Sequence, residues 1–179
     1  MGNIESEAER LHSLVDRMLH LSRLENVHSI TKARIDGTAF LRELSESFQP
    51  QLAPKNMELD LHVSPGLVFE ADELLLRQAV ANLVSNSIDF SPSGSHIDLS
   101  VSVQGSAIHF VVQDTGTGIP DFAKDKIFEK FFSLGRPDSG KKSTGLGLPF
   151  VAEVAALHGG RVILTNLQPG LKAHIVLPL

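Results

Sequence analysis

Two apolar alternating segments, 97–103 and 107–113, are separated by a three-residue turn that contains Gly105. Alternation of this kind predicts half-buried strands, and the short turn predicts an antiparallel hairpin. The segment before them has a helical period instead, because apolar residues recur at three- and four-residue spacing between a predicted N-cap at Asp72 and Ile88. A long helix that leads into a hairpin predicts helices packed on a sheet.

Further elements are predicted on both sides of this unit. Because helices and strands alternate unevenly and include hairpins, the predicted fold class is α+β, a two-layer α/β sandwich with a mixed sheet. The glycine pair after His158 predicts that this histidine caps a helix and is not a ligand. The other expected elements are a helix capped by Thr38 and stopped by Pro50, strands at 57–63 and 67–69, a loop-rich stretch at 115–144, a helix at 146–157, and strands at 162–165 and 173–177.

The first 26 residues predict a long N-terminal helix that precedes the sandwich. Its apolar stripe has heptad spacing, which favours packing against an upstream helix or a second chain; docking on the following domain is the alternative. Residues 27–37 are then a linker, and the globular domain spans 38–179. The stripe consists of Ile4, Leu11, Leu14, Met18 and Leu21, widened by Val15, Leu19 and Leu24.

Composition excludes several classes of function. A chain of 179 residues with 42% hydrophobic content can form one core of ordinary size plus an accessory element. The net charge is −5 and the basic residues form no stripe, so neither nucleic acid nor a membrane surface is an expected partner. The chain has no cysteine, which rules out disulfides and thiolate chemistry. No apolar run reaches the roughly 20 residues of a membrane helix.

A single carboxylate, Asp114, ends the second strand of the hairpin and is followed by Gly116 and Gly118. A carboxylate at a strand end can accept a hydrogen bond from an exocyclic amine, and glycines let the backbone pass close to a flat ligand. The run therefore suits a purine, although a tight turn after a strand is the alternative.

A second glycine motif, 145–148, opens the predicted helix at 146–157 and follows Thr144. Free amides and the positive end of a helix converge there, which favours a phosphate; tight packing is the alternative. On the earlier helix, Asn82 and Asn86 lie four residues apart. One such amide could hold Mg²⁺, which needs few protein ligands, although a structural hydrogen bond is the alternative for both residues and is favoured for Asn82.

An aromatic segment, 127–132, and a basic loop, 133–142, lie between the two glycine motifs. The loop could close over a triphosphate as a lid. The possible phosphate contacts in the two segments are Lys130, Arg136, Lys141 and Lys142, of which at least two are expected to be solvated side chains.

In this order, Asn86, Asp114-x-Gly116-x-Gly118, Phe128 to Phe132 and Gly145-x-Gly147 resemble the N, G1, F and G2 boxes of the sensor histidine kinases. The resemblance covers roughly residues 38–179 as the ATP-binding catalytic domain of Bergerat type, in the GHKL superfamily. Residues 1–26 resemble the second helix of the dimerisation and phosphotransfer hairpin. The runs 89–92 and 131–134 are similar to those of the CreC-type kinases.

The resemblance implies a role for each matching residue. Asn86 would coordinate Mg²⁺, Asp114 would accept from the adenine amino group, and Phe90 would lie against the base. Lys130 and Arg136 would assist transfer by contacting phosphate. The implied nucleotide-binding set is Asn82, Asn86, Phe90, Asp114, Gly116, Gly118, Ile119, Thr144, Gly145, Leu146, Gly147 and Leu148.

Two departures from the family pattern are present. Position 89 is usually basic in the family but is Asp89 here, so one phosphate contact is missing or comes from the lid. Lys142-Ser143 also stands where glycines often precede Thr144.

The phosphoacceptor histidine of the family, which is followed by an acidic residue, has no match among the eight histidines. His12, His20 and His28 precede Ser13, Leu21 and Ser29. The resemblance therefore implies a fragment that binds ATP and Mg²⁺, with the acceptor on an upstream helix that acts in cis or across a homodimer. It further implies a response regulator as partner, a cytoplasmic location for this fragment, and a parent protein anchored in the bacterial inner membrane.

Two alternatives remain open at this point. One is an ATP hydrolase of the gyrase, chaperone or mismatch-repair kind, whose relatives carry a glutamate four residues before the metal-binding asparagine. Position 82 is an amide instead, which cannot act as a general base. The other is a module that senses ATP or dimerises without phosphotransfer.

Overall fold

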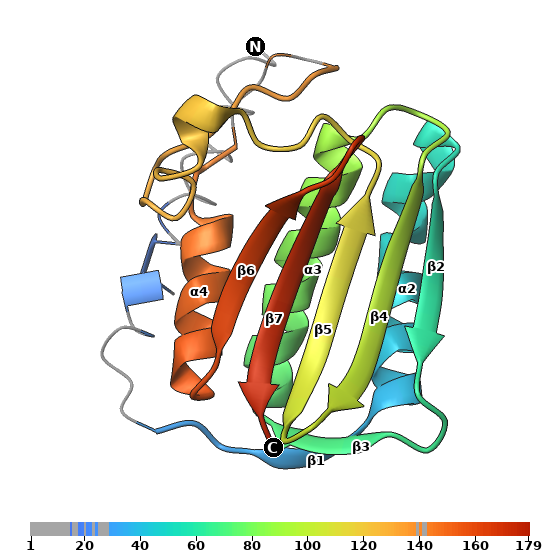
Figure 1. Cartoon of the computed structure of the whole chain (residues 1–179), viewed down its shortest axis with the longest axis vertical. Coiled ribbons are helices and arrows are strands. Elements are labelled where there is room, and N and C mark those ends of the chain that lie inside the picture. Colours follow the sequence, from blue (N-terminus) through green and yellow to red (C-terminus); the bar gives the residue numbers. More distant parts are fainter. Residues whose placement is uncertain are drawn as a thin grey trace.

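The structure, a computed structural model, describes residues 29–138, 140 and 143–179, together with 15, 18, 19, 21, 22 and 24. A five-stranded sheet with the order β2-β4-β5-β7-β6 carries helices α2, α3 and α4 on one face (Figure 1). The predicted α+β sandwich with a mixed sheet is confirmed. The elements are β1 (Ala33–Asp36), α2 (Gly37–Leu52), η1 (Ala53–Lys55), β2 (Glu58–Val63), β3 (Val68–Ala71), α3 (Glu73–Phe90), β4 (His96–Gln104), β5 (Ala107–Asp114), η2 (Asp121–Ala123), α4 (Gly147–Leu157), β6 (Arg161–Asn166) and β7 (Leu171–Pro178).

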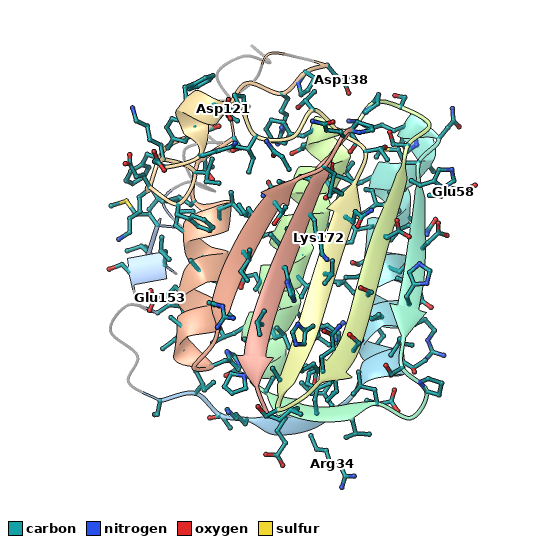
Figure 2. All side chains as sticks on the ribbon, viewed as in Figure 1. Arg34, Glu58, Asp121, Asp138, Glu153 and Lys172 are labelled. Carbon is teal, nitrogen blue, oxygen red and sulfur yellow. The ribbon has the colours of Figure 1, made fainter. Side chains whose placement is uncertain are left out.

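The predicted hairpin of β4 and β5 forms the centre of the sheet. The two strands pair antiparallel with Ile97 opposite Asp114, whereas β2 pairs parallel to β4, which makes the sheet mixed. Alternate residues of both strands, such as Leu99 and Phe110, are fully buried against the helices. The opposite face carries polar side chains, among them Lys172 of β7 (Figure 2). The register therefore fixes where β5 ends, and with it the position of Asp114.

Helix α2 differs from its prediction at both ends. Asp36 is the N-cap in place of Thr38, since its carboxylate accepts from Ala39 N at 2.9 Å. Pro50 lies inside the helix, which continues to Leu52, because a proline in the last turn removes only one hydrogen bond. Residues 33–36, expected to be linker, form β1 and pair with β3 at the end of the sandwich remote from the lid (Figure 1).

Six residues of the predicted N-terminal helix are described, and all six are helical. Leu21 and Leu24 are buried in the core of the domain, whereas Val15, Met18 and Leu19 are about half exposed. Ile4, Leu11 and Leu14 of the predicted stripe lie outside the described residues. Docking of this helix on the domain therefore accounts for the buried residues of the stripe, Leu21 and Leu24, and not for the half-exposed ones. In the part of the chain that the structure describes, no helix has the length and apolar character needed to cross a bilayer.

The predicted caps at Asp72 and His158 are confirmed, and a direct contact joins them. The Asp72 carboxylate caps α3 by accepting from Leu75 N, and Asp72 N donates to His158 Nε2 at 3.0 Å. His158 Nδ1 therefore carries the proton and donates to Val154 O at 2.7 Å. Burial lowers the pKa of this imidazole, which agrees with a neutral ring. The hydrogen bond between Asp72 and His158 therefore joins the start of α3 to the end of α4.

Candidate functional site

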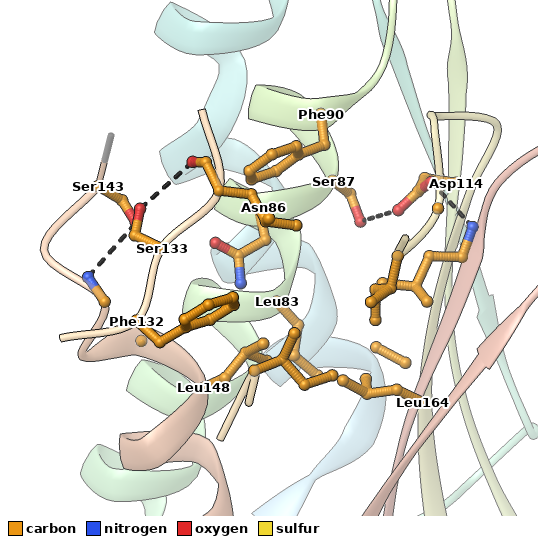
Figure 3. Close-up of a pocket in the computed structure, with 18 of the residues that line it drawn as sticks. Leu83, Asn86, Ser87, Phe90, Asp114, Phe132, Ser133, Ser143, Leu148 and Leu164 are labelled. Atoms are coloured by element: carbon orange, nitrogen blue, oxygen red, sulfur yellow. Dashed lines mark hydrogen bonds between the residues drawn. The ribbon is translucent and has the colours of Figure 1, made fainter. Parts of the chain in front are cut away.

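A pocket opens at the other end of the same two helices, where α3 ends and α4 begins (Figure 3). The loop after β5 forms a third wall, and the segment at 132–134 forms a fourth. Eight of the residues expected to bind nucleotide line this pocket: Asn86, Phe90, Asp114, Gly118, Ile119, Gly145, Gly147 and Leu148. Residues that are 62 positions apart in the sequence are therefore gathered in one cavity.

Asp114 is 5% exposed, and its carboxylate is held by three hydrogen bonds. Oδ1 accepts from Gly116 N at 2.9 Å and from Leu171 N at 3.1 Å. Oδ2 accepts from Ser87 Oγ at 2.8 Å (Figure 3). A carboxylate has about four acceptor positions, so these bonds fix its orientation and leave capacity for a donor in the pocket. An exocyclic amine is such a donor.

The loop after Asp114 is held from two sides. The side-chain amide of Asn166 accepts from Ile119 N and donates to Ile119 O, both at 2.8 Å. On the other side, Gly116 lies so close to α3 that a Cβ there would be 2.5 Å from Phe90 O. Both glycines of the motif therefore belong to a backbone that is fixed at the mouth of the pocket.

The start of α4 presents unused backbone donors. Its first intrahelical hydrogen bond runs from Phe150 N to Leu146 O, and Pro149 has no N–H, so the amides of Gly147 and Leu148 have no acceptor within the helix. Gly145 has φ +68, and a Cβ there would be 2.5 Å from the backbone of Phe131. Only glycine allows this approach. The geometry suits an anion at the helix N-terminus.

Asn86 lies between the carboxylate end and the amide end of the pocket (Figure 3). Its carbonyl oxygen can serve as one metal ligand, and the described residues contain no group of three or more His, Cys, Asp or Glu placed to hold a metal ion. This donor set fits Mg²⁺ that takes its remaining ligands from phosphate and water, and does not fit a metal held by protein alone.

Other expected site residues do not line the pocket. Asn82 donates to Gln78 O within its own helix and faces a separate polar cavity that shares Gly147 with the pocket. Arg136 forms an ion pair with Asp89. The remaining expected residues outside the lining are Gly116, Lys130, Thr144 and Leu146, while Lys141 and Lys142 lie outside the described residues.

Three residues that hold Asp114 or the loop after it by hydrogen bonds are absent from the sequence prediction: Ser87, Asn166 and Leu171. Ser87 directly follows Asn86 in the sequence, and this proximity to a predicted site residue is the signal that could have identified it. Asn166 and Leu171 belong to the β6–β7 hairpin, and they reach the loop across 47 and 57 residues of sequence. No local pattern marks such contacts.

Comparison with known proteins agrees with this geometry. Residues 71–179 match the family described as histidine kinase-, DNA gyrase B-, and HSP90-like ATPase, and the chain belongs to this family. It is thus an ATP-binding domain, and its relatives place it in the sensor histidine kinase branch, as the resemblance implied. The sensor protein CreC of Escherichia coli is 44% identical over 94% of this chain, and the alginate biosynthesis sensor protein KinB of Pseudomonas aeruginosa is 31% identical over 98%.

Solved structures of histidine kinases share the fold. Full-length ShkA in complex with AMPPNP has a TM-score of 0.82 and 30% identity, and the match covers 99% of this chain and 37% of ShkA. ThkA in complex with the response regulator TrrA has a TM-score of 0.79 at 24% identity, over 98% of this chain and 49% of that one. The match covers 35% of CreC and 30% of KinB, so the chain spans about a third of these curated relatives.

Proposed function

We propose that this pocket binds Mg-ATP with the adenine at Asp114 and the phosphates at the start of α4. The observation that carries the proposal is the single cavity that joins a buried, oriented carboxylate to the unused amides of Gly147 and Leu148. Phe90 would lie against the base, and Asn86 would hold the metal between the two ends. Bound Mg²⁺ would neutralise phosphate charge.

We also propose that the parent protein is a two-component sensor histidine kinase of the CreC type. In that reaction a neutral imidazole nitrogen attacks the γ-phosphorus, the bond to the β,γ-bridging oxygen breaks, and ADP leaves. The role of this chain is to position the triphosphate, as phosphoryl transfer requires little else from the protein. The acceptor histidine would come from an upstream helix of the parent, in cis or across a homodimer.

The remaining partners follow from the same proposal. A response regulator would take the phosphate from the histidine, and the complex of ThkA with TrrA supports a partner of this class. The domain would work in the cytoplasm, with the parent anchored in the bacterial inner membrane.

Direct binding tests the site. Isothermal titration with Mg-ATP should give one site per chain, and Asp114→Ala or Asn86→Ala should abolish the heat of binding. Unchanged affinity in both variants would refute the assignment. Thermal unfolding of each variant without nucleotide is the control for folding.

A phosphotransfer assay separates the kinase from its two alternatives. Phosphate from labelled ATP should reach the histidine of an added phosphoacceptor hairpin and not this fragment alone. Steady release of inorganic phosphate without a labelled histidine would favour a hydrolase, against which Asn82 argues, since its amide is bound to Gln78 O and is no base. Binding with neither product would favour a sensing module.

A further inference from the structure

Two ion pairs of opposite polarity hold the lid near the end of α3, one directly and one through Lys55 of η1. The lid is the segment 133–143, of which the structure describes 133–138, 140 and 143. Arg136 Nη2 lies 2.7 Å from Asp89 Oδ2 on the last turn of α3. Lys55 Nζ bonds to Asp138 Oδ2 at 3.0 Å and to Ile88 O at 2.8 Å. Asp138 lies at the end of the molecule where α3 stops (Figure 2).

Asp89 occupies a place that is unfavourable for a carboxylate beside a nucleotide. It lies three residues after Asn86 and next to Phe90, so it shares a helical face with the proposed metal ligand. An unpaired negative charge there would repel a triphosphate. The pairing with Arg136 removes this repulsion, which makes the two side chains one electrostatic unit.

Arg136 retains donors after it has paired with Asp89. The ion pair uses Nη2, and the Nε atom is buried without a hydrogen-bond partner among the described residues. A buried guanidinium donor with no acceptor is costly in a protein, and a phosphate oxygen would satisfy it. The unused donor therefore indicates an anionic ligand.

We propose that Asp89 is a positioning residue that holds Arg136 in place to meet the terminal phosphate of ATP. The inference rests on the proposed function, because it needs the triphosphate at the start of α4. In this arrangement the lid supplies a cation for the phosphate, and Asp89 keeps that cation beside α3. Asp89 thus makes the site selective for the nucleotide with a γ-phosphate.

The pair predicts a particular pattern of non-additive effects. Arg136→Ala leaves the Asp89 carboxylate facing the phosphates, so affinity for AMPPNP should fall about tenfold or more, while ADP should change much less. Asp89→Asn leaves Arg136 unheld and should weaken AMPPNP about threefold, with ADP little changed. The double variant should bind AMPPNP better than Arg136→Ala alone, because the uncompensated charge is gone.

Isothermal titration of AMPPNP and ADP against these three variants provides the test. Asp89→Glu should restore the wild-type ratio of the two affinities. Asp138→Asn is the matched control, since it breaks the other lid ion pair and should leave the ratio unchanged. The melting temperatures of all variants provide a second readout. If the ion pair only stabilised the fold, the substitutions would change the melting temperature and leave the ratio of the two affinities unchanged.

Failure of this inference and failure of the proposed function would give different results. An unchanged AMPPNP to ADP ratio in Asp89→Asn, or a double variant whose effect is the sum of the single effects, would overturn the role of Asp89 and leave the proposed site intact. A wild-type chain that binds neither nucleotide would refute the proposed function and this inference together.

Discussion

Ser87 Oγ donates a 2.8 Å hydrogen bond to Oδ2 of Asp114, so a buried hydroxyl on α3 orients the carboxylate at the end of β5. A hydrogen bond to a charged group contributes about 1.5–3 kcal/mol. Ser87→Ala should therefore weaken ATP binding by roughly tenfold or more, and less than Asp114→Ala does. Titration calorimetry measures the change. Ser45→Ala, which removes another buried hydroxyl on α2, is the matched control, and equal effects of the two serines would contradict this assignment.

The two hydrogen bonds between Asn166 and Ile119 predict an effect on nucleotide binding at the proposed adenine end alone. Asn166→Ala removes both 2.8 Å contacts, and Asn166→Asp keeps the acceptor for Ile119 N but turns a carboxylate toward Ile119 O. Both variants should weaken ATP and ADP by the same factor, of roughly several-fold, because exposed hydrogen bonds contribute about 1 kcal/mol each. Titration with both nucleotides tests this, and selective loss of ATP would contradict it.

The close approach of Gly145 to Phe131 predicts a steric effect at the proposed phosphate end. Gly145→Ala would place a Cβ 2.5 Å from the backbone of Phe131, which should displace the turn before α4, lower the melting temperature and remove ATP binding. Gly105→Ala, in the turn between β4 and β5, is a close control, because its φ of +63 matches the +68 of Gly145 and no described atom outside its chain neighbours lies within 4 Å of the added Cβ. The control shares the backbone strain of about 1 kcal/mol and lacks the collision. Similar losses of binding in both variants would refute the steric argument.

His158 predicts that stability decreases in mild acid. Burial lowers the pKa of its imidazole below the ordinary value of 6.5, so the unfolded chain takes up a proton first as the pH falls through that value. The free energy of unfolding should therefore decrease from pH 7 toward pH 5. His174, whose pKa is also lowered by burial and by His109 beside it, contributes in the same direction.

His158→Gln isolates the contribution of that one residue. Glutamine offers a donor and an acceptor without titrating, so urea unfolding should show a lower stability at pH 7 and a smaller loss between pH 7 and pH 5. His62→Gln replaces an exposed histidine of β2 and should leave the contact between α3 and α4 unaffected, so it serves as the matched control. An unchanged pH dependence in His158→Gln would contradict the inference.

Much of the fold could be predicted because its signals are local. The cap at Asp72, the periodicity of α3 and the alternation of β4 and β5 all lie within short windows of sequence. The start of α2 could not be predicted in this way. Asp36 caps this helix within a turn that is fixed by Gly37 N bonding to Leu67 O, thirty residues away, and β1 exists only through its pairing with β3.

Some residues of the candidate site could likewise be predicted from local sequence patterns, and others could not. The positions of Asp114, Asn86 and the glycine motifs at the pocket could be predicted because each belongs to a short pattern of residue types at a fixed spacing. The supporting contacts are not recognisable, since the amide of Asn166 or a backbone N–H at Leu171 has no distinctive sequence around it. The ion pair of Arg136 with Asp89 is a third case, because its two charges are visible in the sequence and their contact is not.

The contact between Asp72 and His158 has a consequence for the pocket at the other end of the helices. This contact joins α3 to α4 at one end of α3, and the 18 residues of that helix, about 27 Å, separate it from the proposed nucleotide end. A change in the angle between the two helices at this contact would alter the distance between Asn86 and Gly147. Asp72 and His158 would therefore help to determine the width of the proposed site without contacting the nucleotide.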